Sequence, residues 1–263
     1  DYWIVKLDST GNLVWQKSFG GSSYDEATSI DLTTDGGYIV TGWAKSTDGD
    51  VTGNHGNYDY WSVKMDGSGN MIWEKSYGGS TYDQPWFISQ TGDGGYVISG
   101  YSSSSNGNVS GSHGGYDNWI IKLNATGNLV WQNPLGGGSD DRGYSVHGTS
   151  DGGIITVANT FSNNGNVSGN HGSNDYWLVK LDMNGTIEWQ KCLGGTSADI
   201  PNSMQQTADG GYIVAGYASS TNGDVTGNHG GYDFWIVKLS ADIATGISPD
   251  ASGNIISIYP NPV

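Results

Sequence analysis

The chain has 263 residues, of which 44 are glycine and 35% are hydrophobic, and this glycine content excludes a helical bundle. Its 26 acidic side chains outnumber its 10 lysines and arginines, which gives a formal net charge of −16 at pH 7. That charge repels nucleic acid and anionic membranes, so neither is expected as a partner, and it favours solubility or cation binding. No apolar run approaches the length of a membrane-spanning helix, and the single cysteine, Cys192, excludes an internal disulfide framework.

A repeat of 58 residues runs through the chain. Each copy opens with an aspartate two residues before a tryptophan, and these aspartates are Asp1, Asp59, Asp117, Asp175 and Asp233. A second tryptophan recurs at Trp15, Trp73, Trp131 and Trp189. A lysine recurs at Lys6, Lys64, Lys122, Lys180 and Lys238, and an Asp-Gly-Gly sequence recurs at Asp35, Asp93, Asp151 and Asp209. Strict self-similarity of this kind predicts a repeat architecture.

Within one repeat, turn residues separate four segments of strand length. In the second repeat these segments are residues 59–66, 71–77, 86–91 and 96–101. Their alternating patterns and short glycine turns are typical of antiparallel strands. Four such strands per repeat predict an all-β fold, a β-propeller of four-stranded antiparallel blades, with about four blades in residues 1–239. The paired tryptophans are predicted to pack between adjacent sheets.

The segment LDSTGNLVW at residues 7–15, echoed as LNATGNLVW at residues 123–131, resembles the tryptophan-docking motif of quinoprotein-type propellers. It is one residue shorter between the aspartate and the glycine. The resemblance implies that the strand of Trp3 is third in its blade and that the strand of Trp15 is outermost. The innermost strands are then those near Ile30, Ile88, Val146 and Met204.

On that assignment the chain opens with the last two strands of a blade and contains three whole blades. It closes with a blade expected to lack its outermost strand, because no tryptophan follows Leu239. The opening at Asp1, without methionine or signal peptide, indicates a mature form or a fragment. We therefore expect further repeats upstream, and more than four blades in the intact protein.

The last nine residues, IISIYPNPV at 255–263, resemble the opening of the C-terminal sorting domain used in type IX secretion by Bacteroidota. Residues 240–254 are expected to form a linker before it. The repeats also resemble those of secreted and surface proteins of the same bacteria. These resemblances imply export, with an extracellular or outer-membrane surface location.

Connections between antiparallel strands alternate between the two faces of a propeller, so the longer loops, such as residues 20–25 and 46–56, are expected on one face. Tyrosines that can stack on sugar rings recur there, at Tyr24, Tyr58, Tyr82, Tyr116 and Tyr232. They are candidate ligand-binding residues, although packing between blades is the alternative. Four polar residues share one register on the innermost strands and are predicted to line a central channel: Asp31, Ser89, His147 and Gln205.

The long loops also suggest a calcium hypothesis, because they offer several carboxylates among glycines. The candidate ligands are Asp48, Asp50, Asp59, Asp224 and Asp233. No bidentate glutamate closes any of these loops, and the alternative is that Asp and Asn cap the turns. No cofactor is therefore expected, with calcium left open.

Two recurring side chains have structural interpretations. The loop histidines are His55, His113, His171 and His229. They lie too far apart in a ring to share zinc and are expected to bond the backbone of a neighbouring blade. The recurring lysines are predicted to pair between blades with Asp25, Asp83, Asp141 or Asp199.

Catalytic residues are expected to interrupt a repeat, because a reaction needs one site. The best irregular cluster is Asp140, Asp141 and Arg142 with His147, and no pair of carboxylates suited to a glycosidase is evident. We expect a monomeric, non-catalytic binding or scaffold module for glycan or protein at the cell surface. The alternatives are a polysaccharide-degrading enzyme or its accessory domain, and a calcium-stabilised structural module.

Overall fold

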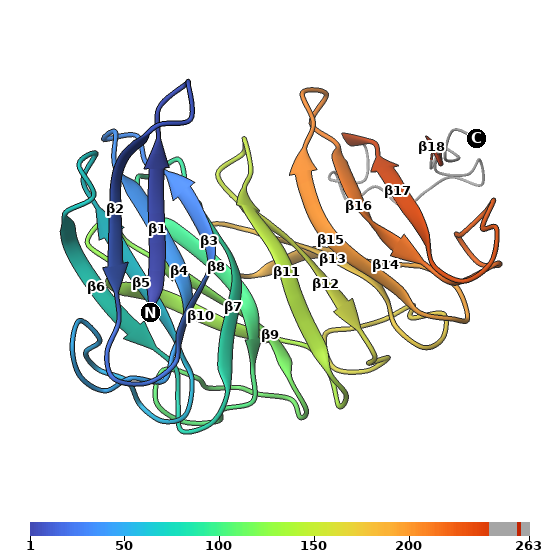
Figure 1. Cartoon of the computed structure of the whole chain (residues 1–263). Coiled ribbons are helices and arrows are strands. Elements are labelled where there is room, and N and C mark those ends of the chain that lie inside the picture. Colours follow the sequence, from blue (N-terminus) through green and yellow to red (C-terminus); the bar gives the residue numbers. More distant parts are fainter. Residues whose placement is uncertain (242–256, 259–263) are drawn as a thin grey trace. The chain divides into compact units, whose positions relative to one another are not determined.

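The computed structural model describes residues 1–241 and 257–258, and almost all of its regular structure is β-strand. The strands are β1 (Tyr2–Leu7), β2 (Leu13–Phe19), β3 (Asp25–Leu32), β4 (Tyr38–Ala44), β5 (Asp59–Met65), β6 (Met71–Tyr77), β7 (Asp83–Gln90), β8 (Tyr96–Ser102), β9 (Asp117–Leu123), β10 (Leu129–Leu135), β11 (Asp141–Gly148), β12 (Ile154–Thr160), β13 (Asp175–Leu181), β14 (Ile187–Leu193), β15 (Asp199–Gln206), β16 (Tyr212–Ala218), β17 (Asp233–Leu239) and β18 (Ser257–Ile258) (Figure 1). No helix in the described part of the chain has the length and apolar character to cross a membrane.

The strands form successive antiparallel sheets in chain order. Four sheets have four strands each, ordered β3-β4-β5-β6, β7-β8-β9-β10, β11-β12-β13-β14 and β15-β16-β17-β18, and β1 pairs with β2 alone. The predicted all-β fold of four-stranded blades is therefore confirmed. The strands of Trp61 and Trp73 are third and fourth in their sheet, as expected.

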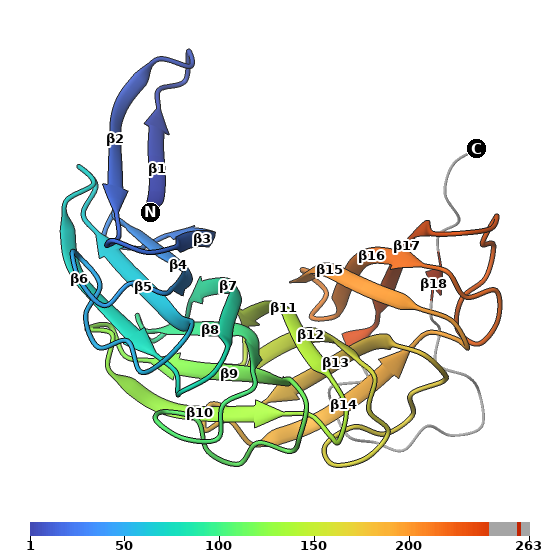
Figure 2. The same ribbon diagram turned by 60° about the horizontal axis from the view of Figure 1, so that its bottom comes forward.

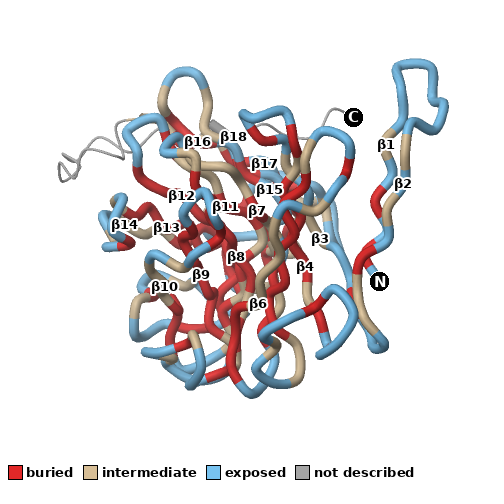
Figure 3. Tube along the Cα trace, turned by 90° about the vertical axis from the view of Figure 1, so that its left-hand side faces the viewer, coloured by how far each residue is buried: buried red, intermediate tan, exposed pale blue. Residues whose placement is uncertain are grey.

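The strands gather into two compact units, residues 1–112 with 118–134, and residues 113–117 with 135–263. Within the first unit, β7 contacts β3, β4 and β5 of the preceding sheet, so the two four-stranded sheets lie against each other (Figure 2). The third strands β5, β9 and β13 are buried along their whole length, whereas the fourth strands β6, β10 and β14 are partly exposed (Figure 3). Burial on both faces explains the apolar content of these third strands.

Aromatic contacts join the sheets inside each unit. In the first unit, the Tyr60 ring lies 4.6 Å from the Trp119 ring, and its hydroxyl donates to the Trp119 carbonyl at 2.9 Å. Tyr2 and Trp61 repeat this arrangement, with ring centroids 4.5 Å apart and a hydrogen bond of 2.8 Å. Trp61 and Trp119 are fully buried. The predicted packing of these tryptophans between sheets is thus observed, and each has a tyrosine partner from the neighbouring sheet.

The prediction that the recurring lysines form ion pairs between blades is wrong for Lys64, Lys122, Lys180 and Lys238, which each pair within their own sheet. Lys64 Nζ lies 2.9 Å from Asp35, the aspartate of the Asp-Gly-Gly turn in the same sheet. The same pairing joins Lys122 to Asp93 at 2.9 Å and Lys238 to Asp209 at 2.8 Å. A lysine on the third strand points toward the turn that joins the first two strands, because that turn lies at the same end of the sheet. The ion pair therefore holds the Asp-Gly-Gly turn within its own blade.

The last sheet differs from expectation in its fourth strand. The two-residue strand β18 pairs antiparallel with β17, with Val237 opposite Ile258 and Lys238 opposite Ser257. The blade expected to lack an outermost strand therefore takes two residues from the segment assigned to the sorting domain. The remainder of that segment and nearly all of the expected linker, residues 242–256 and 259–263, lie outside the described residues.

Candidate functional site

The first unit gathers its longer loops at one end. Because its strands form antiparallel meanders, the loops β2–β3, β4–β5, β6–β7 and β8–β9 lie at the end opposite the short turns, at the bottom of Figure 1. We call this end the loop-rich face. Loops held on a rigid sheet scaffold are the usual location of binding residues.

The buried aspartates that open β3, β7, β11 and β15 hold these loops in place. Asp83, fully buried, accepts hydrogen bonds from Gly79 N at 2.7 Å and from Ser104 Oγ at 2.9 Å, and a further one from the Ser102 hydroxyl. Burial raises the pKa of Asp83, and the hydrogen bonds from Ser102 and Gly79 counteract that rise. Because Asp83 accepts hydrogen bonds from the loops on both sides of it, it fixes the conformation of those loops.

Asp141 has the same environment in the second unit. It is fully buried and accepts from Gly137 N and Ser162 Oγ, both at 2.7 Å, and from the Thr160 hydroxyl. His147 lies six residues further along β11, which is about 20 Å in an extended strand. The structure therefore does not bring Asp141 and His147 together, and the catalytic cluster suggested by the sequence does not converge.

Arg142 and Tyr116 are brought together instead. The Arg142 guanidinium lies 4.7 Å from the centre of the Tyr116 ring and donates to Asp140 at 2.9 Å. Tyr116 is half-buried beneath this cation. Tyr116 in the second unit is thus a packing residue beneath Arg142 rather than a free surface for stacking on a ligand.

The four inner-strand residues divide between the two units. In the first unit, Asp31 on β3 accepts from Gln90 N on β7 at 3.0 Å, next to Ser89. In the second unit, His147 Nε2 lies 3.3 Å from Ser145 Oγ, and Gln205 is exposed. Asp31 therefore links the first strands of two sheets, and all four residues share one register on the first strand of their sheet. That they line a central channel stays a prediction.

The aspartates proposed as calcium ligands all accept backbone N–H groups. Asp48 accepts from Ser22 N at 2.7 Å and Asp50 from Gly20 N at 3.2 Å. Asp224 likewise accepts from Gly194 N at 3.2 Å. No group of three or more His, Cys, Asp or Glu side chains in residues 1–241 is placed to hold a metal. These contacts are those of turn capping, and calcium binding stays a prediction.

The loop histidines bond an aspartate of their own loop, so the expected contact with a neighbouring blade's backbone is wrong. His55 Nδ1 lies 2.7 Å from Asp59 Oδ2, which also accepts from His55 N at 2.8 Å. His171 repeats this with Asp175 at 2.6 Å, and His229 with Asp233 at 3.3 Å. Asp59 is fully buried, and desolvation raises its pKa while His55 opposes that shift. Asp59 therefore orients an imidazole through Oδ2, while its buried Oδ1 accepts no hydrogen bond in the described part of the chain.

An aromatic cluster made of Trp43, Tyr58 and Tyr82 lies on the loop-rich face of the first unit. The rings of Trp43 and Tyr58 are 4.7 Å apart, and those of Tyr58 and Tyr82 are 5.3 Å apart. Tyr58 and Tyr82 form a parallel bridge, in which Asp83 N donates to the Tyr58 carbonyl at 2.8 Å. Tyr82 remains 42% exposed. The cluster thus presents an aromatic surface fixed by backbone hydrogen bonds.

The sequence interpretation identified the two tyrosines of this cluster but missed Trp43. A signal was present, because Trp43 is one of only two tryptophans outside the repeated register, with Trp86. In the second unit a tyrosine, Tyr217, stands in the register of Trp43, and its ring lies 5.2 Å from Tyr232. The combination of tryptophan with two tyrosines is therefore a feature of the first unit.

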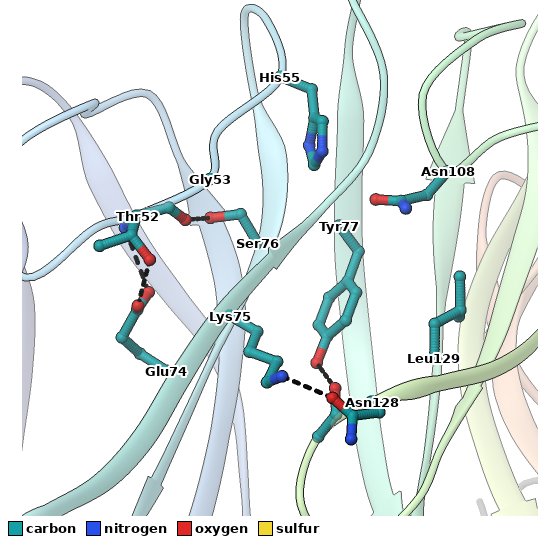
Figure 4. A pocket seen from close by; sticks show the side chains of 11 residues that line it. Thr52, Gly53, His55, Glu74, Lys75, Ser76, Tyr77, Asn108, Asn128 and Leu129 are labelled. Carbon is teal, nitrogen blue, oxygen red and sulfur yellow. Dashed lines mark hydrogen bonds between the residues drawn. The ribbon is translucent and has the colours of Figure 1, made fainter.

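A hollow lies between the two four-stranded sheets of the first unit (Figure 4). We call it the outer groove; its volume is about 400 Å³, and the residues that define it are His55, Glu74, Lys75, Tyr77, Asn108 and Asn128. Tyr77 donates to the Gly127 carbonyl at 2.5 Å, and Lys75 to Asn128 Oδ1 at 2.7 Å. Figure 4 shows His55 and Asn108 at one end of the groove and Lys75 with Asn128 at the other.

Comparison with solved structures shows the fold. A hydrazine synthase chain of Kuenenia stuttgartiensis is 12% identical, with a TM-score of 0.58, and the match covers 97% of this chain and 58% of that one. The Pan2 WD40 domain of Neurospora crassa is 14% identical, with a TM-score of 0.45, and the match covers 85% and 65%. An endo-1,4-β-xylanase of Bacteroides thetaiotaomicron is 11% identical, with a TM-score of 0.44, and the match covers 91% and 76%.

The hydrazine synthase match supports the assignment to the β-propeller fold, and at such low identity it supports the fold alone. This chain spans 58% of the length of that hydrazine synthase chain. No protein-family model matches the chain, and no curated protein sequence matches it. Function must therefore be argued from the residues of the site.

Proposed function

We propose that the protein is a non-catalytic β-propeller module that binds neutral glycans on its loop-rich face. The aromatic cluster carries this proposal, because its three rings contact in series, from Trp43 to Tyr58 to Tyr82, and Tyr82 is partly exposed. Tyrosine and tryptophan provide large, rigid, amphipathic contact surfaces that lose little conformational entropy on binding. Such a surface suits the apolar face of a sugar ring.

Charge favours a neutral glycan over an acidic one. The chain carries a formal net charge of −16, and its field opposes the approach of a polyanion. A cation next to the cluster is Lys45, whose Nζ lies 5.5 Å from the centre of the Tyr58 ring. Within the described part of the loop-rich face, this cation is stacked on the ring rather than grouped with others that would bind an acidic polymer.

The contacts of the buried carboxylates support binding rather than turnover. Asp83 and Asp141 are surrounded by loop donors and stand at the starts of inner strands. A glycosidase needs an acid and a base that face one substrate bond. The enzyme alternative would need such a pair elsewhere in the chain.

Oligosaccharide titration tests the proposed function. Cellohexaose, mannohexaose and laminarihexaose would be titrated into the protein, with intrinsic tryptophan fluorescence and calorimetry as readouts. We expect one of them to bind, Tyr82→Ala to weaken binding about 10-fold or more, and Tyr82→Phe to preserve it, since loss of an anchoring aromatic ring costs about 2 kcal/mol or more. The matched control is Ile72→Ala, an exposed residue on β6 away from the cluster.

Two results would contradict the proposal. One is the absence of binding by all three neutral hexasaccharides, and the other is equal affinity of the wild type and Tyr82→Ala. Release of reducing ends from any of the three would instead support the enzyme alternative.

We further propose export to the cell surface. The support is the resemblance of residues 255–263 to the start of a type IX sorting domain. Cell fractionation of the native host, with an antibody against the propeller, tests it. Confinement of the protein to the cytoplasmic fraction would refute export and leave the glycan proposal unaffected.

A further inference from the structure

We infer that the outer groove is a second sugar subsite, which takes one neutral sugar residue and binds its hydroxyl groups with His55 and Asn108. The inference rests on the proposed function, because it adds a subsite to the same glycan-binding unit. Its evidence is independent of the aromatic cluster: a hollow of about 400 Å³ with polar groups at both ends. Ligand sites are typically hollows of this size with a few placed polar groups.

The hydrogen bonds already made in the groove determine which atoms are left for a ligand. His55 uses Nδ1 for the buried Asp59, at 2.7 Å, so the imidazole is held with Nε2 available to a ligand. Asn108 Oδ1 accepts from Gly78 N at 3.1 Å, which leaves the Nδ2 amide as its donor. Lys75 uses one of its donors for Asn128. The structure shows no hydrogen bond at His55 Nε2 or Asn108 Nδ2 within residues 1–241.

The repeat itself indicates how close these two groups lie. In the second unit the equivalent positions hold His171 and Asp224, and His171 Nε2 lies 3.9 Å from Asp224 Oδ2. By this equivalence the His55 ring and the Asn108 side chain are close enough to bind the same ligand hydroxyl. Asn108 cannot form the ion pair that Asp224 forms, so His55 Nε2 is not committed to an internal carboxylate.

The chemistry of these groups matches adjacent sugar hydroxyls. A hydroxyl both donates and accepts, so one hydroxyl can donate to His55 Nε2 while it or its neighbour accepts from Asn108 Nδ2. Tyr77 and Leu129 supply apolar surface within the same groove. Tyr77 also interrupts the repeat, since Phe19, Leu135 and Leu193 occupy its register.

An acidic ligand is less suited to this groove. Glu74 accepts from Thr52 N at 3.3 Å, from Thr52 Oγ1 at 2.5 Å and from Trp61 Nε1 at 2.8 Å, so it stays in place as a negative charge on one wall. With Asp59 beneath His55, the two carboxylates offset the charge of Lys75. A ligand carboxylate would therefore enter the groove without a net positive partner.

Asn108→Asp tests the subsite with little risk to the fold. Repeats one and four already have aspartate in this register, and Asp50 and Asp224 make the same bond to a glycine N–H, at 3.2 Å in both. In the variant we expect the new carboxylate to pair with His55 as Asp224 pairs with His171. The matched control is Asn106→Asp, which adds the same charge on the same loop but faces Ser80, where Asp48 makes the equivalent bond to Ser22.

Two readouts follow, both on the full chain. The first is the His55 imidazole NMR signal during titration with methyl β-glucoside and methyl α-mannoside, with galacturonate as the acidic comparison. We expect a neutral glycoside to shift this signal in the wild type and Asn106→Asp but not in Asn108→Asp. The second is hexasaccharide affinity, which we expect Asn108→Asp to weaken about 5- to 10-fold, the value of one or two lost hydrogen bonds.

Each outcome bears on one proposal or both. If Tyr82→Ala loses hexasaccharide binding while no glycoside shifts the His55 signal, the proposed function holds and the outer groove inference is overturned. If a glycoside shifts His55 but Tyr82→Ala binds as the wild type does, the groove is supported and the role of the aromatic cluster is overturned. A shift with galacturonate alone overturns the neutral-sugar assignment.

Discussion

Removal of one buried hydroxyl should measure how strongly adjacent blades are joined. In Tyr60→Phe the ring contact with Trp119, at 4.6 Å, is kept, while the hydrogen bond of 2.9 Å to the Trp119 carbonyl is lost. A neutral hydrogen bond contributes about 0.5–1.5 kcal/mol net, and a buried acceptor left without its partner costs about 1–3 kcal/mol. We therefore expect Tyr60→Phe to lower the free energy of unfolding by about 1–2 kcal/mol. The melting temperature should fall by about 2–8 °C, since 1 kcal/mol shifts it by roughly 2–4 °C in a chain of this size.

Urea denaturation followed by tryptophan fluorescence gives the free energy directly, because Trp119 is itself a reporter of the contact. Tyr24→Phe is the matched control, since Tyr24 is 73% exposed and its hydroxyl is solvated. Tyr60→Ala, which also removes the ring, should cost about 3–5 kcal/mol. The reasoning is refuted if Tyr60→Phe unfolds at the same urea concentration as the wild type, or if Tyr24→Phe is equally destabilised.

Three further predictions concern the ion pairs, the loop carboxylates and the metal hypothesis. The hydrogen bond from Thr33 and the pairing with Lys64 lower the pKa of Asp35 from 3.8 to about 2, so its stabilising effect is present above pH 4 and is lost as pH falls through 2. Melting curves from pH 5 to pH 2 should therefore show the difference between wild type and Asp35→Asn shrinking toward zero, and a difference independent of pH would contradict this account. Asp141→Ala should lower the free energy of unfolding by about 2–4 kcal/mol in chemical denaturation, because it leaves several buried donors unpaired. If the variant is as stable as the wild type but has lost a hydrolytic activity, Asp141 is again a catalytic candidate. Because Asp48 and its equivalents accept N–H groups, EDTA should leave the melting temperature unchanged; a fall of several degrees, reversed by Ca²⁺, would establish the calcium-stabilised alternative.

The contacts of the recurring lysines and histidines show where sequence reasoning reached its limit. Lys64 could be recognised as a recurring cation, but several aspartates recur at the same interval and offer equal charge. Asp35 is the partner because the third strand ends beside the turn of the first hairpin, and that turn contains Asp35. His55 is a similar case, since its partner Asp59 is only four residues away but is equally a candidate calcium ligand by sequence.

The sequence by itself determined the blade. The period of 58 residues, the alternation within each segment and the glycine turns specify four antiparallel strands per repeat, because these are local constraints on backbone and register. It also placed Tyr58 and Tyr82 at the ends of two loops that lie on the loop-rich face. Local patterns of this kind are repeated in each copy, so their signal is reinforced along the chain.

Only the tertiary structure decided which side chains meet. It brought Tyr58 into contact with both Trp43 and Tyr82, and placed Asn108 beside the groove that His55 lines. These relations depend on how one sheet packs on the next and on how each loop is held by its buried aspartate. Distances between residues from different blades are not encoded by spacing within a repeat, and the candidate sites are made of such pairs.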